Sequence, residues 1–144
     1  MKNLIHAVPL VLAALLALPA LPLMAADAEQ KVTEETPYVP SPKIVVDTML
    51  SMANVHAGDY LIDLGSGDGR IIITAALEYG VSGIGVDYDP QLVQLATKNA
   101  KKAGVADKAR FVERNVFKTD LSSASVVTIY LLPEYNAALK PRLY

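Results

Sequence analysis

A glycine-rich segment carries the clearest chemical signal in this chain of 144 residues. It runs from Asp63 to Arg70 and reads Asp-Leu-Gly-Ser-Gly-Asp-Gly-Arg, directly after a short apolar run. Glycines in such a loop can adopt positive φ angles and let a ligand approach the backbone closely. An acid two residues before the first glycine adds a charged group to the loop. The segment therefore predicts a binding site for a small molecule.

The acids around this loop indicate what the small molecule is. Asp87 comes 22 residues after Gly65, at the end of the next apolar run, where a carboxylate can accept hydrogen bonds from both hydroxyls of a ribose. Asp63 and Asp68 would repel a pyrophosphate, so they favour a ligand with a positive centre and no pyrophosphate. S-adenosylmethionine has these properties, because it carries a ribose, an ammonium and a sulfonium.

Two other nucleotide-binding loops fit the segment less well. The dinucleotide fingerprint G-x-G-x-x-G would place glycine or alanine where Arg70 stands. A P-loop needs a Gly-Lys pair followed by serine or threonine, and none follows here. A nicotinamide-dependent dehydrogenase fragment is therefore an alternative that Asp63 and Arg70 disfavour.

The elements that position these residues alternate between apolar strands and helices. We expect strands at Tyr60–Leu64, Ser82–Val86, Ala109–Glu113 and Ser125–Leu132. We expect helices from Pro42, capped by Ser41, to about Met52; over Arg70–Tyr79, ended by Gly80; from Pro90, capped by Asp89, to Gly104; and over Pro133–Leu143.

This alternation predicts an α/β fold, namely a Rossmann-like doubly wound parallel sheet with three α/β/α layers. The sequence stops after about four strands, whereas a doubly wound sheet normally continues beyond its switch point. The last strand would then have an open edge, which is a liability in a mature protein. We therefore expect a fold truncated at its C-terminus and a chain that is a fragment of a longer coding sequence.

The N-terminal segment predicts export. Residues 3–26 contain no Asp, Glu, Lys or Arg, and small residues follow them. We expect residues 1–28 to be a signal peptide cleaved after Ala28, or alternatively a membrane anchor. Residues 29–40 would be a linker and residues 41–144 the ligand-binding domain. Lys2 before the apolar run places the domain on the periplasmic side, exported or membrane-anchored; a misassigned leader would leave it cytoplasmic.

Composition excludes several classes of function. The formal net charge is −2, with 13 basic and 15 acidic residues, so no basic excess exists to bind nucleic acid through its phosphates. The chain has no cysteine, which excludes a disulfide scaffold and a cysteine nucleophile. No group of His, Asp and Glu has metal-ligand spacing, so we expect no metal.

Four stretches of the chain resemble class I S-adenosylmethionine-dependent methyltransferases. Within that superfamily they resemble the small lysine methyltransferases related to the mitochondrial ATP-synthase c-subunit lysine methyltransferase and, more distantly, the Dot1-like group. The stretches are Tyr38–Pro42, Asp63–Arg70, Gly85–Pro90 and Tyr130–Glu134.

The resemblance implies roles for particular residues. The three loop glycines would let the methionine part of the cofactor lie against the backbone. Asp63 would lie near the methionine amino group. The family more often has Asp than Asn at position 115, which weakens that one contact. The implied cofactor-binding residues are Gly65, Gly67, Gly69, Asp63 (amino group) and Asp68; Asp87 (ribose); Tyr88, Asn115 and Val116 (adenine); and Tyr38, folded over the cofactor.

The resemblance also implies the reaction, which is in-line transfer of a methyl group to a protein lysine amine. Tyr130, Pro133 and Glu134 follow the fourth predicted strand, where this superfamily places its methyl-transfer residues. Glu134 or a backbone carbonyl near Pro133 would orient the amine, and Tyr130 is a second candidate. Because S-adenosylmethionine is made in the cytosol, the predicted leader leaves another alternative open: a non-catalytic exported domain that binds a nucleotide-type ligand.

Overall fold

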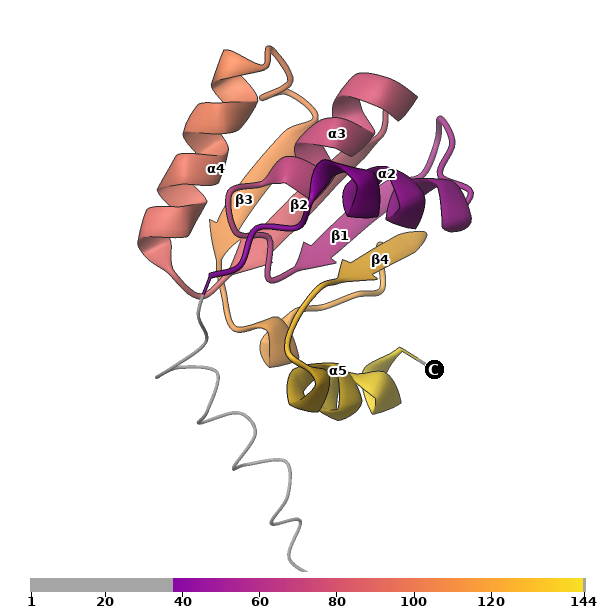
Figure 1. Ribbon diagram of the computed structural model, residues 1–144, viewed down its shortest axis with the longest axis vertical. Coiled ribbons are helices and arrows are strands. Elements are labelled where there is room, and N and C mark those ends of the chain that lie inside the picture. The colour runs from indigo at the N-terminus through magenta and orange to yellow at the C-terminus, as the bar shows by residue number, and fades with distance from the viewer. Residues whose placement is uncertain (1–37, 144) are drawn as a thin grey trace, which may run out of the picture.

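The computed structural model describes residues 38–143, which form one α/β unit (Figure 1). The predicted leader and most of the predicted linker lie outside the described residues. Within residues 38–143, no helix is long and apolar enough to cross a membrane.

The strands and helices follow the predicted order closely. The strands are β1 (Tyr60–Leu64), β2 (Ser82–Asp87), β3 (Ala109–Glu113) and β4 (Val126–Ile129). The helices are α2 (Lys43–Met52), α3 (Arg70–Tyr79), α4 (Pro90–Lys102) and α5 (Pro133–Leu139), with short 3-10 turns at Val116–Lys118 and Lys140–Arg142.

Two predicted helix signals are confirmed. Gly80 ends α3 with a φ of 70°, and the Asp89 side chain accepts a hydrogen bond from the Gln91 N–H at the start of α4. Left-handed φ angles strain residues that carry a Cβ, and unpaired N–H groups at a helix start need an acceptor. Both positions therefore select their residue type for a local reason.

Three predicted boundaries are wrong. Ser41 does not cap α2; Pro42 holds the N-cap position and its carbonyl accepts from the N–H groups of Val45 and Val46. The fourth strand ends at Ile129, because pairing with β1 ends there. The last helix ends at Leu139, and Pro141, which has no N–H to donate, lies in the 3-10 turn that follows.

The four strands form one parallel sheet in the order β3-β2-β1-β4. This confirms the predicted parallel α/β fold. The chain moves outward from β1 through β2 to β3 and then returns to the other side of β1. The carboxyl ends of β1 and β4 therefore lie beside a switch point, where open α/β sheets bind ligands. Among residues 38–143, β4 pairs with β1 alone.

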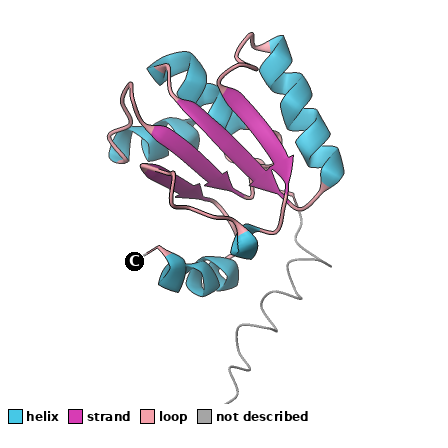
Figure 2. Ribbon diagram, turned by 180° about the vertical axis from the view of Figure 1, so that it is seen from behind, coloured by secondary structure: helices cyan, strands magenta, loops and turns pink. Residues whose placement is uncertain are grey.

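The sheet separates two hydrophobic clusters. On one face Leu61 packs with residues of α2, α3 and α4, including Leu50 and Ile72. On the other, Ile62 and Leu64 pack with Leu139 of α5. Successive strand residues point to opposite faces, so the apolar run of β1 supplies both clusters. Figure 2 shows the second face, with α5 near the carboxyl ends of the strands.

Replacing Leu50 with alanine should destabilise the fold by about 2 to 5 kcal/mol, because this fully buried side chain fills the space between α2 and the sheet. Urea unfolding measures the loss. Leu77→Ala is the matched control in α3, where the side chain is 57% exposed, and it should change stability by less than about 0.5 kcal/mol. Equal losses would contradict the packing described here.

Candidate functional site

A cavity of about 740 Å³ lies at the switch point of the sheet. Its walls come from the loop after β1, the turn after β2, the segment after β4 and the residues before α2. Residues far apart in the sequence thus meet around one space. Of the predicted site residues, those that line it are Tyr38, Gly65, Gly67, Asp68, Asp87, Tyr88, Val116, Tyr130 and Pro133.

The glycine loop has the conformation that its sequence predicts. Gly65, Gly67 and Gly69 have φ angles of 83°, 53° and 84°. The loop is also crowded: a Cβ on Gly67 would lie 2.5 Å from the Tyr38 ring, and one on Gly65 would collide with Leu131. Glycine is needed at both positions for backbone conformation and for the close approach of neighbouring side chains.

Asp87, at the end of β2, joins the glycine loop to the turn after β2. Its Oδ2 accepts a hydrogen bond from the Gly67 N–H at 2.8 Å, and its Oδ1 accepts from the Asp89 N–H at 3.0 Å. A carboxylate has about four acceptor sites, so both oxygens can accept further hydrogen bonds from a ligand. The side chain therefore orders the loop and also lines the cavity.

Asp63 lies behind the loop rather than in the cavity wall. Its side chain is 1% exposed, and its Oδ1 accepts a hydrogen bond from the Thr128 hydroxyl at 2.7 Å, across the β1–β4 pairing. Its Oδ2 is buried without a hydrogen-bond partner in the described part of the chain. Burial raises the pKa of Asp63 to about 7, the Thr128 hydrogen bond opposes the rise, and the Asp87 charge adds to it.

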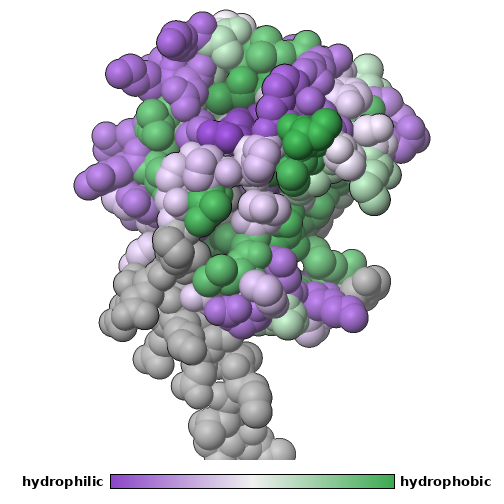
Figure 3. Space-filling model, in the orientation of Figure 1, coloured by the Kyte–Doolittle hydropathy of each residue, from purple (hydrophilic) through white to green (hydrophobic). Residues whose placement is uncertain are grey.

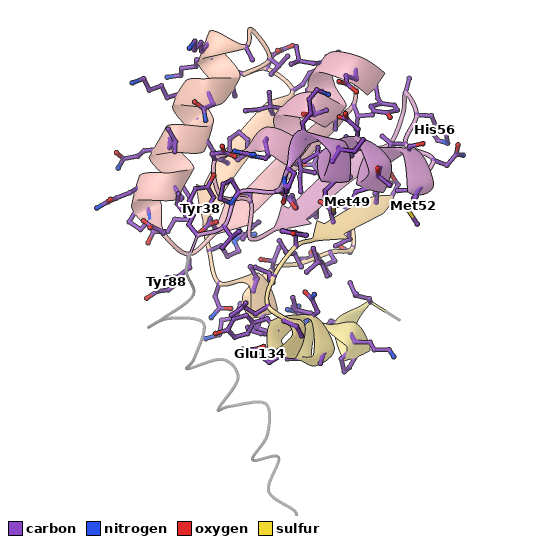
Figure 4. All side chains as sticks on the ribbon, in the orientation of Figure 1. Tyr38, Met49, Met52, His56, Tyr88 and Glu134 are labelled. Carbon is purple, nitrogen blue, oxygen red and sulfur yellow. The ribbon has the colours of Figure 1, made fainter. Side chains whose placement is uncertain are left out.

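Three other predicted residues also lie outside the cavity lining. Gly69 packs against Phe111 of β3. The Asn115 side-chain oxygen accepts from the Phe117 N–H and caps the 3-10 turn, while Val116, next to it, reaches the cavity. Glu134 is an exposed acid in the first turn of α5 (Figure 4).

The segment after β4 forms the opposite wall of the cavity. Tyr130, Leu131, Leu132 and Pro133 all line it, and so does Tyr135 on α5. Because β4 ends at Ile129, these residues are loop and helix-start residues rather than strand residues. The Leu131 carbonyl accepts from the Asn136 side chain at 3.2 Å. This hydrogen bond fixes the loop against α5.

Two buried residues with polar side chains, Ser66 and Tyr135, are among the wall residues that sequence reasoning missed. Ser66 is 6% exposed, lines the cavity and has a buried hydroxyl without a hydrogen-bond partner among the described residues. Tyr135 is 4% exposed and comes two residues after Pro133. The position of Ser66 between Gly65 and Gly67 was a usable signal. Nothing in the local sequence distinguished Tyr135 from an ordinary core residue.

No group of three or more His, Asp and Glu side chains that could hold a metal ion is present among residues 38–143. The charged side chains that line the cavity are those of three acids and one arginine, Asp68, Asp87, Asp89 and Arg70.

Comparisons with known proteins find methyltransferases. The profile of the ANTKMT methyltransferase domain matches residues 63–144. A protein-lysine N-methyltransferase from Saccharolobus islandicus is 46% identical over 108 residues, covering 74% of this chain and 67% of the relative. The mouse ATP-synthase c-subunit lysine N-methyltransferase is 35% identical over 107 residues, covering 74% of this chain and 42% of the relative.

A solved structure is also similar. It is an RNA methyltransferase from Salinibacter ruber in complex with S-adenosyl-L-homocysteine, with a TM-score of 0.72 and 55% identity. The match covers 73% of this chain and 69% of that protein. The described chain thus spans about two thirds of two of these relatives and less than half of the mouse protein.

The stability of the protein should depend on pH through Asp63. Its pKa is near 3.8 when unfolded and about 7 when folded, so the folded state binds more protons between these values. The stabilisation is fully present below pH 3.8 and is lost as pH rises to about 7. Asp63→Asn should remove this dependence and be more stable than the wild type at pH 7.5, by roughly 1 to 4 kcal/mol.

Urea unfolding at a series of pH values measures this difference. Asp107→Asn, at an exposed position, is the control and should keep the wild-type profile. Parallel profiles for the wild type and Asp63→Asn would show that the carboxyl is ionised in the folded state.

Proposed function

Because this chain belongs to the ANTKMT methyltransferase domain family, we propose that it transfers a methyl group from S-adenosylmethionine to the side-chain amine of a lysine in a protein. The predicted methyltransferase class and cofactor agree with the family match and with the similar proteins. None of these matches favours a dehydrogenase or a non-catalytic binding domain. The identity of the acceptor protein is not part of the proposal.

The cavity fits S-adenosylmethionine in its polar groups and its backbone. Ser66 Oγ in the cavity lining and Asp63 Oδ2 behind the glycine loop are buried oxygens without partners in the described chain, and buried polar groups normally need one. Gly67 has no room for a Cβ, because the Tyr38 ring of the cavity wall already lies against it. Asp87 keeps acceptor capacity for ribose hydroxyls, and Tyr88 and Val116 line the cavity beside it.

S-adenosylmethionine, when bound, supplies a methyl group on a positively charged sulfur. The residues of this chain have to place an acceptor in line with that methyl group and exclude water, since positioning supplies much of the rate of such a displacement. Tyr38 and Tyr130 are partly exposed aromatic side chains of the cavity wall. They are suited to enclose an incoming side chain without adding a charge.

A lysine amine must lose its proton to solvent before it can accept a methyl group, and burial against the apolar side chains of Leu131 and Leu132 in the cavity wall would lower the pKa of its ammonium. We assign the positioning of this amine to the Tyr130 hydroxyl and the Pro133 backbone, which line the cavity. Glu134, the third predicted candidate, does not line it. The acid therefore has no direct part in this proposal.

The observation that carries the choice of a protein acceptor is the charge of the cavity. Three acids line it, and its single arginine is paired with Asp68, whereas an RNA acceptor calls for basic groups that meet phosphates. Lys101 and Lys102 lie in the last turn of α4, about 17 Å along the helix from the cavity residue Pro90. Acids at the site attract an ammonium group and repel a phosphate backbone.

The surface of the cavity rim supports the same choice. Apolar or aromatic side chains that are exposed and line the cavity come from both walls. Figure 3 shows hydrophobic side chains gathered between the sheet and α5, and mostly polar side chains over α4. These rim residues are Tyr38, Val39, Tyr88, Tyr130 and Leu132. A protein segment with apolar residues beside its lysine would match this rim.

We also propose export, or membrane attachment through the N-terminal segment, on the strength of the uncharged residues 3–26 alone. Mass spectrometry of the protein purified from its own host tests this proposal. A mature chain that begins at Glu29 supports cleavage after Ala28, and an intact chain in the cytosolic fraction contradicts both forms of the proposal.

Methyl transfer should be detected when the full chain is incubated with S-adenosylmethionine carrying a radioactive methyl group and with protein or RNA from its host. We expect label on lysine of protein.

Asp87→Ala should weaken cofactor affinity by at least about tenfold, because it removes charge-assisted hydrogen bonds. Asp107→Ala, outside the cavity, should bind like the wild type.

The labelling experiment and a calorimetric titration with S-adenosylmethionine together separate the possible results. Label on RNA alone would reject the protein acceptor but keep the methyltransferase. Absence of cofactor binding by the folded chain would reject the activity for this chain as given.

Gly67→Ala should abolish or strongly weaken cofactor binding, because the new methyl group would meet the Tyr38 ring and close the space over the loop. Gly104→Ala is the matched control: its φ is 73°, and a Cβ there would meet nothing within 4 Å. Both variants should lose roughly 1 kcal/mol of stability from the left-handed conformation, but only the first should lose affinity. Equal affinities would contradict the proposed position of the cofactor.

A further inference from the structure

Residues 38–41 form a short segment before α2, and all four line the cavity. We call this segment the strap. Among residues 38–143, no backbone-to-backbone hydrogen bond joins the strap to the rest of the protein. Side chains of the glycine loop therefore have to hold it in place.

Arg70 is the principal contact between the loop and the strap. Its Nε and Nη2 donate to the two carboxylate oxygens of Asp68, at 2.9 and 2.6 Å, and its Nη1 donates to the Ser41 carbonyl at 2.6 Å. The two hydrogen bonds to Asp68 fix the plane of the guanidinium. In this plane Nη1 points toward the strap. A lysine could not make these three contacts, because an ammonium has no planar fork.

Tyr38 forms the second contact. Its ring lies against Gly67, and the Asp68 carboxylate lies near enough to influence its hydroxyl. Burial raises the pKa of Tyr38, the Asp68 carboxylate adds to the rise, and the Arg70 guanidinium opposes it. Asp68 thus contacts both ends of the strap, directly through Tyr38 and indirectly through Arg70 and Ser41. Figure 4 shows Tyr38 beside the glycine loop.

Asp68 is itself anchored to the body of the domain. Its backbone carbonyl accepts a hydrogen bond from the Asn99 side chain of α4 at 2.9 Å. Both of its carboxylate oxygens are already bonded to Arg70, which also holds the pKa of Asp68 below its usual range. This pairing leaves Asp68 poorly placed to act as a free charge toward a ligand, although its sequence position predicted direct binding.

We propose that Arg70 and Asp68 are positioning residues that clamp the strap over the cavity and so control the entry and release of the cofactor. The proposal rests on the proposed function, because it takes the ligand of the cavity to be S-adenosylmethionine. Opening the clamp requires loss of the Ser41 hydrogen bond and movement of one tyrosine ring off Gly67. The strap can therefore open while α2 and the sheet stay in place.

A spin label on the strap tests the clamp without any cofactor. The chain has no cysteine, so Val39→Cys, at a position 63% exposed, provides a single labelling site. In this background Arg70→Lys and Tyr38→Phe should each increase the mobility of the nitroxide. The matched control is Arg110→Lys on β3, at an exposed position outside the cavity, which should leave the mobility unchanged. Unchanged mobility in both clamp variants would overturn the proposal.

Binding kinetics of S-adenosylmethionine in the chain without the label test the functional part. Loss of the clamp should raise the association and dissociation rates together, the latter about tenfold, as expected for a lost hydrogen bond to a charged group. Loss of a direct ligand contact would raise the dissociation rate alone, and that result would overturn the positioning role. Greater mobility in a chain that binds no cofactor would reject the proposed function and the control of release, while leaving the clamp contacts supported.

Discussion

The parallel pairing of β1 with β4 is the constraint on which the rest of the site depends. It sets Asp63 opposite Thr128 and ends at Leu64 and Ile129. The glycine loop and the Tyr130–Pro133 segment therefore start from neighbouring positions at one edge of the sheet. Strands β2 and β3 lie on the other side of β1, so the helices leave a crevice between the two segments. This single pairing therefore brings the glycine loop and the segment after β4 together as two walls of the cavity.

The glycine loop connects three parts of the site through close packing. Gly65 leaves room for Leu131 in the segment after β4, Gly67 leaves room for the Tyr38 ring of the strap, and Gly69 leaves room for Phe111 of β3. A side chain at any of these positions would displace its neighbour as well as straining the loop backbone. The three glycines that the loop backbone needs thus also set how closely the strap, the sheet and the segment after β4 approach the loop.

The acids of the site have different roles because their surroundings differ. Among residues 38–143 no cation is paired with Asp63, whose pKa is raised, whereas Asp68 is paired with Arg70 and has a lowered pKa. Asp87 bonds to two backbone N–H groups and still lines the cavity. Of these three acids, Asp87 alone both lines the cavity and has no cation paired with it in the described part of the chain. This arrangement explains how a chain of nearly neutral net charge can discriminate by charge at one place.

The sequence by itself determined the order of the strands, most helix boundaries and the glycine loop, because each depends on local periodicity or on residues that tolerate a particular φ. It did not determine that Ser41 would accept from Arg70 through its carbonyl, that Glu134 would lie outside the cavity, or that Tyr135 would lie inside it. The first outcome depends on how the segment before α2 lies against the glycine loop, and the other two depend on where β4 stops pairing and how α5 packs on the sheet. Such contacts join residues tens of positions apart, so only the tertiary structure decided them.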